Sequence, residues 1–239
     1  LLLLMMMIIM LLLLLLLLLL LLLCLCRWKS CFPSPSLQKC RAAPSSSNSN
    51  TRIWSSDDRD FLTTHLQTSL DAIISAVDTI TEEQWNWQPD SNTWSIALVV
   101  EHLITHEELF YREVRVLSNL PSLPSVENTA FAIDEAIMSY QDITDQNRGE
   151  APSYLVPKGR WCKKSTALES YLDSRQAMIE FASTTAVNLR SYYTKSGRGP
   201  TTYRDLHQLL LISVAHTHRH AKQIRSLLDH PEFPKRDNM

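Results

Sequence analysis

The amino-acid sequence predicts an all-α protein built as a four-helix bundle, with a hydrophobic helix at the N-terminus. Three observations carry this prediction. Four segments of about 20 to 28 residues place apolar residues at helical spacing, so each has one apolar face. Glycine is scarce, with four residues in 239, and no segment alternates apolar and polar residues as a half-buried strand does. The length suits one domain with appendages.

The N-terminal segment predicts a membrane anchor. Residues 1–23 are uninterrupted apolar and end in the leucine run 11–23. As a helix they would span about 34 Å, enough for a hydrocarbon core of about 30 Å. All flanking charges follow the run, so the positive-inside rule predicts a single-pass membrane protein with its domain in the cytoplasm. Residues 1–28 are therefore assigned to a poly-leucine transmembrane or leader segment.

Two other interpretations of this segment stay open. A hydrophobic leader before a basic, acid-free stretch is also typical of targeting sequences, whose cleavage would leave the domain in an organelle or outside the cell. A leucine run this pure also arises when a nucleotide repeat upstream of the true start is translated. The next segment, 29–56, is rich in Ser and Pro, and we expect a disordered linker because its apolar content does not offset chain entropy.

Charge and cysteine usage limit the function classes. Five of the 23 basic residues and none of the 25 acidic residues precede Asp57, so 18 basic residues remain beside all 25 acids. An acidic domain without basic clusters argues against nucleic acid as a partner. Four of the five cysteines also precede Asp57, which excludes a disulfide framework for the domain. The fifth, Cys162, is expected to be an inert loop residue.

The predicted domain, 57–235, opens with a helix and a short turn. Acidic residues from Asp57 onward suit a helix start, and this helix is expected to run to about Ile80. A cap-like start at Thr81 then opens a short turn that ends at Pro89.

Three further long helices follow. The second long helix is expected over 95–119, where prolines end it. Residues 125–163 are the least regular part, with a short helix at 132–144. The third long helix is expected over 165–193 and the fourth over 201–228. The connection between the second and third helices is long enough to cross the end of the bundle, so simple up-down-up-down order is not implied.

The last helix carries three histidines, His216, His218 and His220. Residues four apart stack on one helix face, so His216 and His220 point together, within the apolar seam of the helix. His218 lies about 200° round the axis and is expected to face water. A lone histidine in a seam is usually a packed core residue, but two buried rings both need partners. Two inward imidazoles one turn apart form half of a metal site.

A complete metal site needs a further ligand from another helix. The candidates are the five remaining histidines: His65, His102, His106, His207 and His230. By periodicity His102 and His106 can both point inward, and helical spacing does not choose between them. His65 is expected to be half-exposed, His207 to lie at the rim, and His230 to lie in the tail after the last helix.

Two groups of residues resemble signatures of the DinB-like (DinB/YfiT) superfamily of metal-binding four-helix bundles. The first signature is matched by Trp87-Gln88-Pro89, Trp94-Ser95 and Glu101-His102-Leu103, and the C-terminal one by residues 216–224 followed by 231–234. The resemblance covers roughly 57–235. It implies a metal held by one histidine from the second long helix and two from the fourth, which here are His102, His216 and His220. His106 would then belong to the surrounding core.

The resemblance also implies a chemistry. The cofactor would be a divalent transition metal, namely zinc, nickel, iron or manganese. Some superfamily members are metal-dependent transferases or isomerases that use low-molecular-weight thiols, so we expect a metal-dependent thiol S-transferase or isomerase. The alternatives are a metal-dependent hydrolase, a binding bundle without turnover, and a helical domain whose histidines are merely packed. The expected partners are a small-molecule substrate, a low-molecular-weight thiol and, through the N-terminal segment, the membrane; a homodimer is also considered.

No catalytic residue beyond the ligands is assigned from the sequence. Glu101 belongs to the first signature and Glu107 follows it, and both are expected to be solvated helix residues rather than groups that orient a ligand. Arg219 is not on the face of His216 and His220, so a surface ion pair is expected for it.

Overall fold

The computed structural model describes residues 52–121, 132–142, 150–195 and 203–235. The chain divides into two compact units, Leu1–Ser47 and Asn48–Met239, and all described residues belong to the second. The leucine run and almost all of the predicted linker lie outside the described residues.

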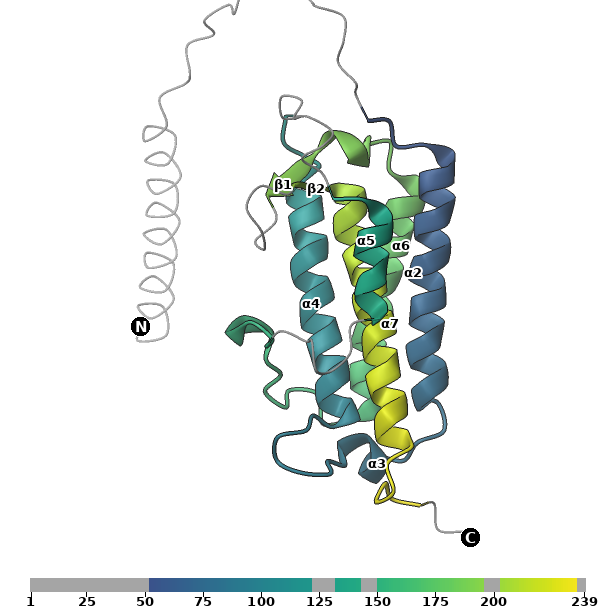
Figure 1. The fold of residues 1–239 in the computed structure, drawn as a ribbon, viewed down its shortest axis with the longest axis vertical. Coiled ribbons are helices and arrows are strands. Elements are labelled where there is room, and N and C mark those ends of the chain that lie inside the picture. The colour runs from purple at the N-terminus through teal and green to yellow at the C-terminus, as the bar shows by residue number, and fades with distance from the viewer. Residues whose placement is uncertain (1–51, 122–131, 143–149, 196–202, 236–239) are drawn as a thin grey trace, which may run out of the picture. The chain divides into compact units, whose positions relative to one another are not determined.

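Four long helices form the second unit, which confirms the all-α class and the four-helix bundle (Figure 1). They are α2 (Ser56–Val77), α4 (Ile96–Leu117), α6 (Lys164–Thr184) and α7 (Leu206–Leu228). Helices α2 and α4 each pack against both α6 and α7, so the two helices that come first along the chain are not packed side by side.

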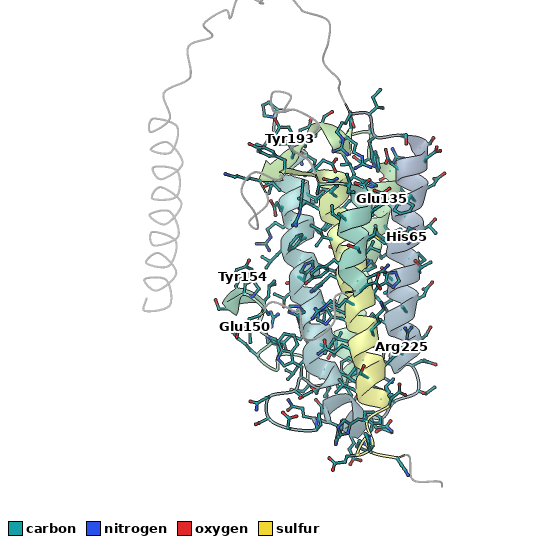
Figure 2. All side chains as sticks on the ribbon, in the orientation of Figure 1. His65, Glu135, Glu150, Tyr154, Tyr193 and Arg225 are labelled. Atoms are coloured by element: carbon teal, nitrogen blue, oxygen red, sulfur yellow. The ribbon has the colours of Figure 1, made fainter. Side chains whose placement is uncertain are left out.

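The helix directions also depart from simple alternation. Lys164, at the start of α6, donates hydrogen bonds to carbonyl groups at the end of α2, whereas Arg59, near the start of α2, reaches the end of α6. Helices α2 and α6 are therefore antiparallel. Tyr193 on β1 (Tyr193–Lys195) lies at the end where α7 starts, and Arg225 lies towards the other end of α7 (Figure 2).

The connection between α4 and α6 explains this topology, because it returns along the length of the bundle. Its described parts include α5 (Asp134–Met138), the 3-10 turn η2 (Ser139–Asp142) and the 3-10 turn η4 (Ser153–Leu155). The first two pack on α7 and the third contacts α4. From its length, we expected this segment to cross the end of the bundle. It instead returns along the bundle, past the middle of α7 and the start of α4. The expected departure from simple up-down-up-down order is observed.

Side-chain caps fix the starts of the helices. Ser55 is the N-cap of α2, where Asp58 completes a capping box, so the cap lies before the acidic run rather than within it. Thr81 caps the short helix α3 (Glu82–Asn86), as the sequence indicates, and Ser95, where the second long helix was expected to start, is the N-cap of α4. Capping boxes also start α3 at Thr81 and α7 at Asp205.

The third and fourth helices are shorter than expected. Helix α6 ends at Thr184 because the Arg59 guanidinium donates to the carbonyls of Ala182, Ser183 and Thr185, a contact between helices that local periodicity does not reveal. The chain then forms a short 3-10 turn, η5 (Leu189–Ser191), and two antiparallel strands, β1 and β2 (Tyr203–Asp205). Strands of three residues are too short to show an alternating pattern.

The sequence predicts that the folded domain starts at residue 57. In the structure it starts earlier. The Trp54 side chain is buried in the core, and its indole Nε1–H donates to His207 Nδ1 at 3.0 Å. Arg52 donates to Asp205 at 2.7 Å. Residues 52–56, which were assigned to the linker, are therefore ordered parts of the bundle.

The apolar core consists of two clusters separated by a polar layer. One cluster contains Leu103, Tyr171 and Ile224, and the other contains Val114 and Met178. Between them along the helices lie buried polar residues from all four long helices: Ser69, His102, His106, Glu107, Arg175, His216, Thr217 and His220. Because these polar groups are buried in the middle of the bundle, they need hydrogen-bond or charge partners within the protein or from a bound ligand.

The expected membrane location is corrected by the structure. Across the described ranges, no helix is long and apolar enough to cross a membrane. We therefore do not retain the assignment of a single-pass membrane protein with a cytoplasmic domain. The leucine run on which that assignment rested lies outside the described residues.

Candidate metal centre

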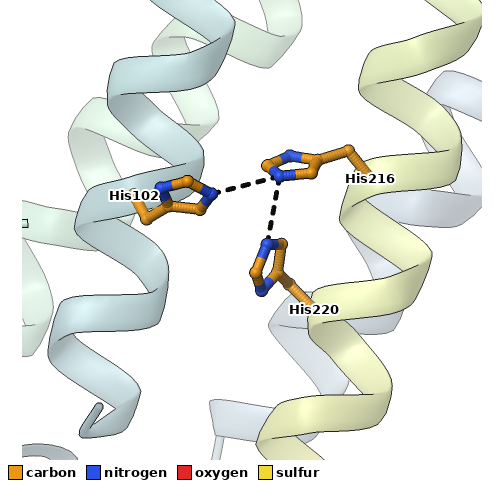
Figure 3. Close-up of side chains that lie close together, drawn as sticks. All are labelled: His102, His216 and His220. Carbon is orange, nitrogen blue, oxygen red and sulfur yellow. Dashed lines mark hydrogen bonds between the residues drawn. The ribbon is translucent and has the colours of Figure 1, made fainter. Parts of the chain in front are cut away.

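Three imidazoles from two helices converge in the polar layer (Figure 3). His102 comes from α4, and His216 and His220 come from successive turns of α7. The Nε2 atom of His216 lies 3.1 Å from Nε2 of His102 and 3.1 Å from Nε2 of His220. One ligand atom from each of the three residues lies within 4.8 Å of the other two, a spacing that one metal ion can bridge. All three side chains are buried.

The outer nitrogens of two rings fix which nitrogen faces the centre. His102 Nδ1 lies 2.7 Å from the carbonyl oxygen of Leu155, which can only accept, so Nδ1 carries the proton. In the same way His220 Nδ1–H donates to Oε1 of Gln223 at 2.7 Å. A neutral imidazole protonated at Nδ1 has a lone pair at Nε2. Both rings therefore direct lone pairs at His216.

His216 cannot donate a hydrogen bond to both His102 and His220. Its Nε2 carries at most one proton, so one of the two 3.1 Å contacts joins two lone pairs. Its Nδ1 is buried and has no hydrogen-bond partner among the described residues. A divalent cation accepts several lone pairs at once, so three neutral imidazoles arranged in this way fit a metal site.

Burial keeps these imidazoles neutral, which is the form that binds metals. Desolvation lowers the pKa of His102, although its hydrogen bond to Leu155 opposes the shift. Desolvation also lowers the pKa of His216 and of His220 well below the ordinary value, and the neighbouring histidines add to it. Protonation therefore does not compete with a metal near neutral pH.

Glu101 fixes the loop that orients His102. Its carboxylate accepts the backbone N–H groups of Lys158 and Arg160, both at 2.7 Å, and pairs with the Arg160 side chain. This loop follows Leu155, whose carbonyl receives the His102 proton. Glu101 is 2% exposed, so the expectation of a solvated residue was wrong. The sequence does not reveal this role, because its partners are backbone groups of an irregular segment.

Glu107 is buried as well, within a network on the other side of the polar layer. It pairs with Arg175 of α6, and both side chains are almost inaccessible to solvent. Arg175 also donates to Thr217 Oγ1 at 2.7 Å, next in sequence to His216. Burial alone would lower the pKa of Arg175, but the facing carboxylate raises it, so the guanidinium stays charged. The pair links α4, α6 and α7 beside the candidate ligands.

His106, the alternative to His102, does not join the three converging nitrogens. Its ring stacks between Phe110 and His216, at centroid distances of 4.1 Å and 4.0 Å. Burial lowers its pKa to about 3. Periodicity could not separate His102 from His106, because both do point inward; the choice between them came only with the resemblance.

The remaining histidines lie elsewhere. His65 is half-buried against Phe61, as expected, and His230 lies beside Trp87 after the last helix. His218 is half-buried rather than facing open solvent. His207 is buried at the start of α7, not at the rim, because Trp54 covers it.

A second group of potential ligands, Asp58, Asp134 and His207, surrounds a cation that is already present. The Arg190 guanidinium contacts Asp58 at 2.5 Å and Asp134 at 2.6 Å, and pairs with Asp205 at 3.2 Å. These carboxylates are therefore compensated by the protein itself, and the group is an ion-pair network that ties the starts of α2, α5 and α7 together.

Comparison with known proteins identifies the family. A model of the DinB superfamily matches residues 65–224, which is more than half of the chain and contains all three converging histidines. A search of curated proteins found no match. A search of solved structures found YfiT from Bacillus subtilis, described as a probable metal-dependent hydrolase with an unusual four-helix bundle topology. The two are 15% identical, with a TM-score of 0.46 over 78% of this chain and 91% of YfiT.

Proposed function

Because the chain belongs to the DinB superfamily, we propose that it is a metal-dependent enzyme in which His102, His216 and His220 hold one divalent ion. The ion would be zinc, nickel, iron or manganese. The proposal rests on one observation, the convergence of three Nε2 atoms of which at least two present lone pairs. No carboxylate joins them in the described part of the chain, so the ligand set is uncharged.

The ligand set determines what the ion would contribute. Held by three neutral imidazoles, such an ion would keep its full charge and would promote loss of a proton from a small molecule such as a thiol or water. The protein's own residues hold the geometry. Leu155 and Gln223 fix the proton on the outer nitrogen of their histidines, and burial keeps the rings neutral.

Transfer of a low-molecular-weight thiol to a small electrophilic substrate is our first candidate reaction. It is supported by the absence of a free acid near the three histidines in the described ranges. Glu101 is bound to a loop and Glu107 to Arg175, so neither is available as a general base. A thiol needs less help than water to ionise, because its pKa is several units lower.

Hydrolysis is the second candidate, since an uncharged three-histidine set is also one that lowers the pKa of water, to about 7 on zinc. Turnover of a thiol with an electrophilic aromatic halide would indicate the transferase. Turnover of an activated ester in the absence of thiol would indicate the hydrolase. Metal uptake without either turnover would instead indicate a binding bundle.

Metal analysis tests the site itself. Full-length protein is expected to hold about one equivalent of metal, since the three nitrogens form one site. Replacement of His102, His216 or His220 by Ala should remove most of this metal. His218→Ala is the matched control on the same helix and should retain it. Retention of metal by all three ligand variants would refute the proposed site.

A further inference from the structure

The Arg219 guanidinium lies beside the three histidines rather than in a surface ion pair. Arg219 is half-buried, and its Nη1 lies 3.5 Å from Nε2 of His220, at the limit of a hydrogen bond. Its guanidinium carbon lies 5.8 Å from the centre of the Tyr140 ring. The Tyr140 ring itself faces His216, at a centroid distance of 6.3 Å. The connection between α4 and α6 therefore holds this cation against the candidate metal centre.

Arg219 has no acidic partner among the residues that the structure describes. The two buried acids of α4 are engaged elsewhere, Glu101 with the loop and Glu107 with Arg175. The acid of η2, Asp142, pairs with Lys222 at 2.6 Å. A half-buried guanidinium facing only imidazole and phenol rings is unusual, because arginine at such positions is normally paired with a carboxylate or a phosphate.

The positive charges of Arg219 and of a bound metal ion would need a nearby negative charge. The His220 lone pair that Arg219 approaches is the one that a metal ion would take, so the weak contact of 3.5 Å cannot persist in the loaded protein. A divalent ion and a guanidinium would then lie close together with no negative charge between them in the described residues. A ligand with an anionic group compensates both.

We propose that Arg219, held by Tyr140, is a specificity-determining residue that binds the carboxylate of a small-molecule ligand beside His102, His216 and His220. The inference rests on the proposed function and narrows its substrate class to small carboxylic acids, including thiols that carry a carboxylate. The planar fork of arginine matches a carboxylate with two parallel hydrogen bonds, which lysine cannot form. Tyr140 orients the fork through its ring face.

Two probes of nearly equal shape test the proposal. Mercaptoacetate and its neutral counterpart mercaptoacetamide differ in the carboxylate, while both offer the same thiol. Their dissociation constants are measured on full-length protein loaded with cobalt(II), from the thiolate-to-cobalt absorption. We expect Arg219→Met to reduce the preference for mercaptoacetate by roughly tenfold or more, the effect of a lost charged hydrogen bond. Arg219→Lys and Tyr140→Leu should reduce it in part.

Controls separate this inference from the proposed function. Arg225→Met removes an exposed cation from the same helix (Figure 2) and should leave the preference unchanged. Cobalt content is measured for every variant, and Arg219→Met should bind cobalt at least as well as the unmodified chain. Unchanged probe preference in Arg219→Met, with normal cobalt content, would overturn this inference alone. A chain that takes up no cobalt would overturn the proposed function and this inference with it.

Discussion

At the scale of single residues, the hydrogen bond at Nδ1 of His102 and of His220 determines that Nε2 carries the lone pair. Gln223 lies three positions after His220, on the same helix face, and accepts the His220 Nδ1 proton at 2.7 Å. His102 depends in the same way on the Leu155 carbonyl. The Gln223 contact follows from helical spacing and could be found from the sequence. The Leu155 contact depends on how a distant loop returns to α4, so no local pattern reveals it.

Gln223→Leu should weaken metal binding without unfolding the bundle. The substitution keeps the side-chain bulk but removes the acceptor that fixes the His220 tautomer, and loss of such a partner typically costs 10- to 100-fold in metal affinity. Competition with a zinc chelator measures the affinity. Ser226→Ala, at an exposed position of the same helix, is the control and should bind metal normally. Equal affinities for the two variants would show that Gln223 does not orient a ligand.

At the scale of elements, the long connection acts on α4 through Glu101. We expect Glu101→Ala to lower metal affinity by about tenfold, because the loop that carries Leu155 loses two backbone contacts and His102 loses its fixed orientation. Chelator competition again gives the affinity. Glu108→Ala removes an exposed acid from the same helix and should have no effect. If Glu108→Ala weakened binding as much, the effect would be one of overall charge.

The buried pair between α4 and α6 gives a second prediction at this scale. Arg175→Met should lower the free energy of unfolding by about 3 to 5 kcal/mol, because it leaves the Glu107 carboxylate buried without a counter-charge. The double variant Glu107→Leu with Arg175→Met should recover much of this loss, since it removes both charges. Urea unfolding of the metal-free proteins measures both values. A double variant less stable than the single one would contradict this account.

The sequence predicts the elements well where a local signal exists. Thr81 caps its helix, and all four amphipathic segments form long helices. The features that were predicted wrongly depend on contacts between residues far apart in the sequence. Arg59 ends α6 early by binding its last carbonyls, and Trp54 draws in the residues before α2. The buried positions of Glu101 and Glu107 were missed because their partners lie on other elements.

At the scale of the whole molecule, the buried histidines make stability depend on pH. Burial lowers the pKa of His106 to about 3 and that of His207 to about 4, against 6.5 in the unfolded chain. Below pH 6.5 the unfolded chain therefore binds protons that the folded chain does not. Each such histidine removes about 1.4 kcal/mol of stability per pH unit as the pH falls from 6.5 towards its folded pKa.

Bound metal should make the stability of the folded protein fall more steeply as the pH is lowered. Ligand histidines exchange metal for protons in acid, so the loaded protein loses the stabilisation from bound metal in addition to the loss described for the metal-free form. Because burial lowers the pKa of all three histidines, this exchange begins well below pH 6.5. Thermal unfolding of zinc-loaded and metal-free protein is therefore compared between pH 7.5 and the lowest pH at which the metal-free form stays folded. We expect the larger fall in melting temperature for the loaded form. The same fall in both forms would show that protons and metal do not compete.

The boundary of the folded unit also yields a prediction. The chain from residue 48 keeps Trp54 and the Ser55 cap, whereas the chain from residue 57 loses both. We expect both fragments to be helical, with the shorter one less stable by about 3 kcal/mol or more, from the lost aromatic burial and the lost cap. Urea unfolding with circular dichroism compares them. Equal stability would place the boundary at residue 57 after all.

Because the connection between α4 and α6 returns along the bundle, the histidines and the residues that border them lie on different parts of the chain. Helices α4 and α7 supply the three histidines, but Leu155 and Tyr140, which border them, belong to the returning segment. Within this segment, η2 is separate from the contact between Leu155 and His102. Exchanging η2 alone, with its Tyr140, should alter which molecules are accepted while the same ion is still held. Under the proposed function, different η2 sequences on the same four helices would admit different substrates while the buried histidines stay unchanged.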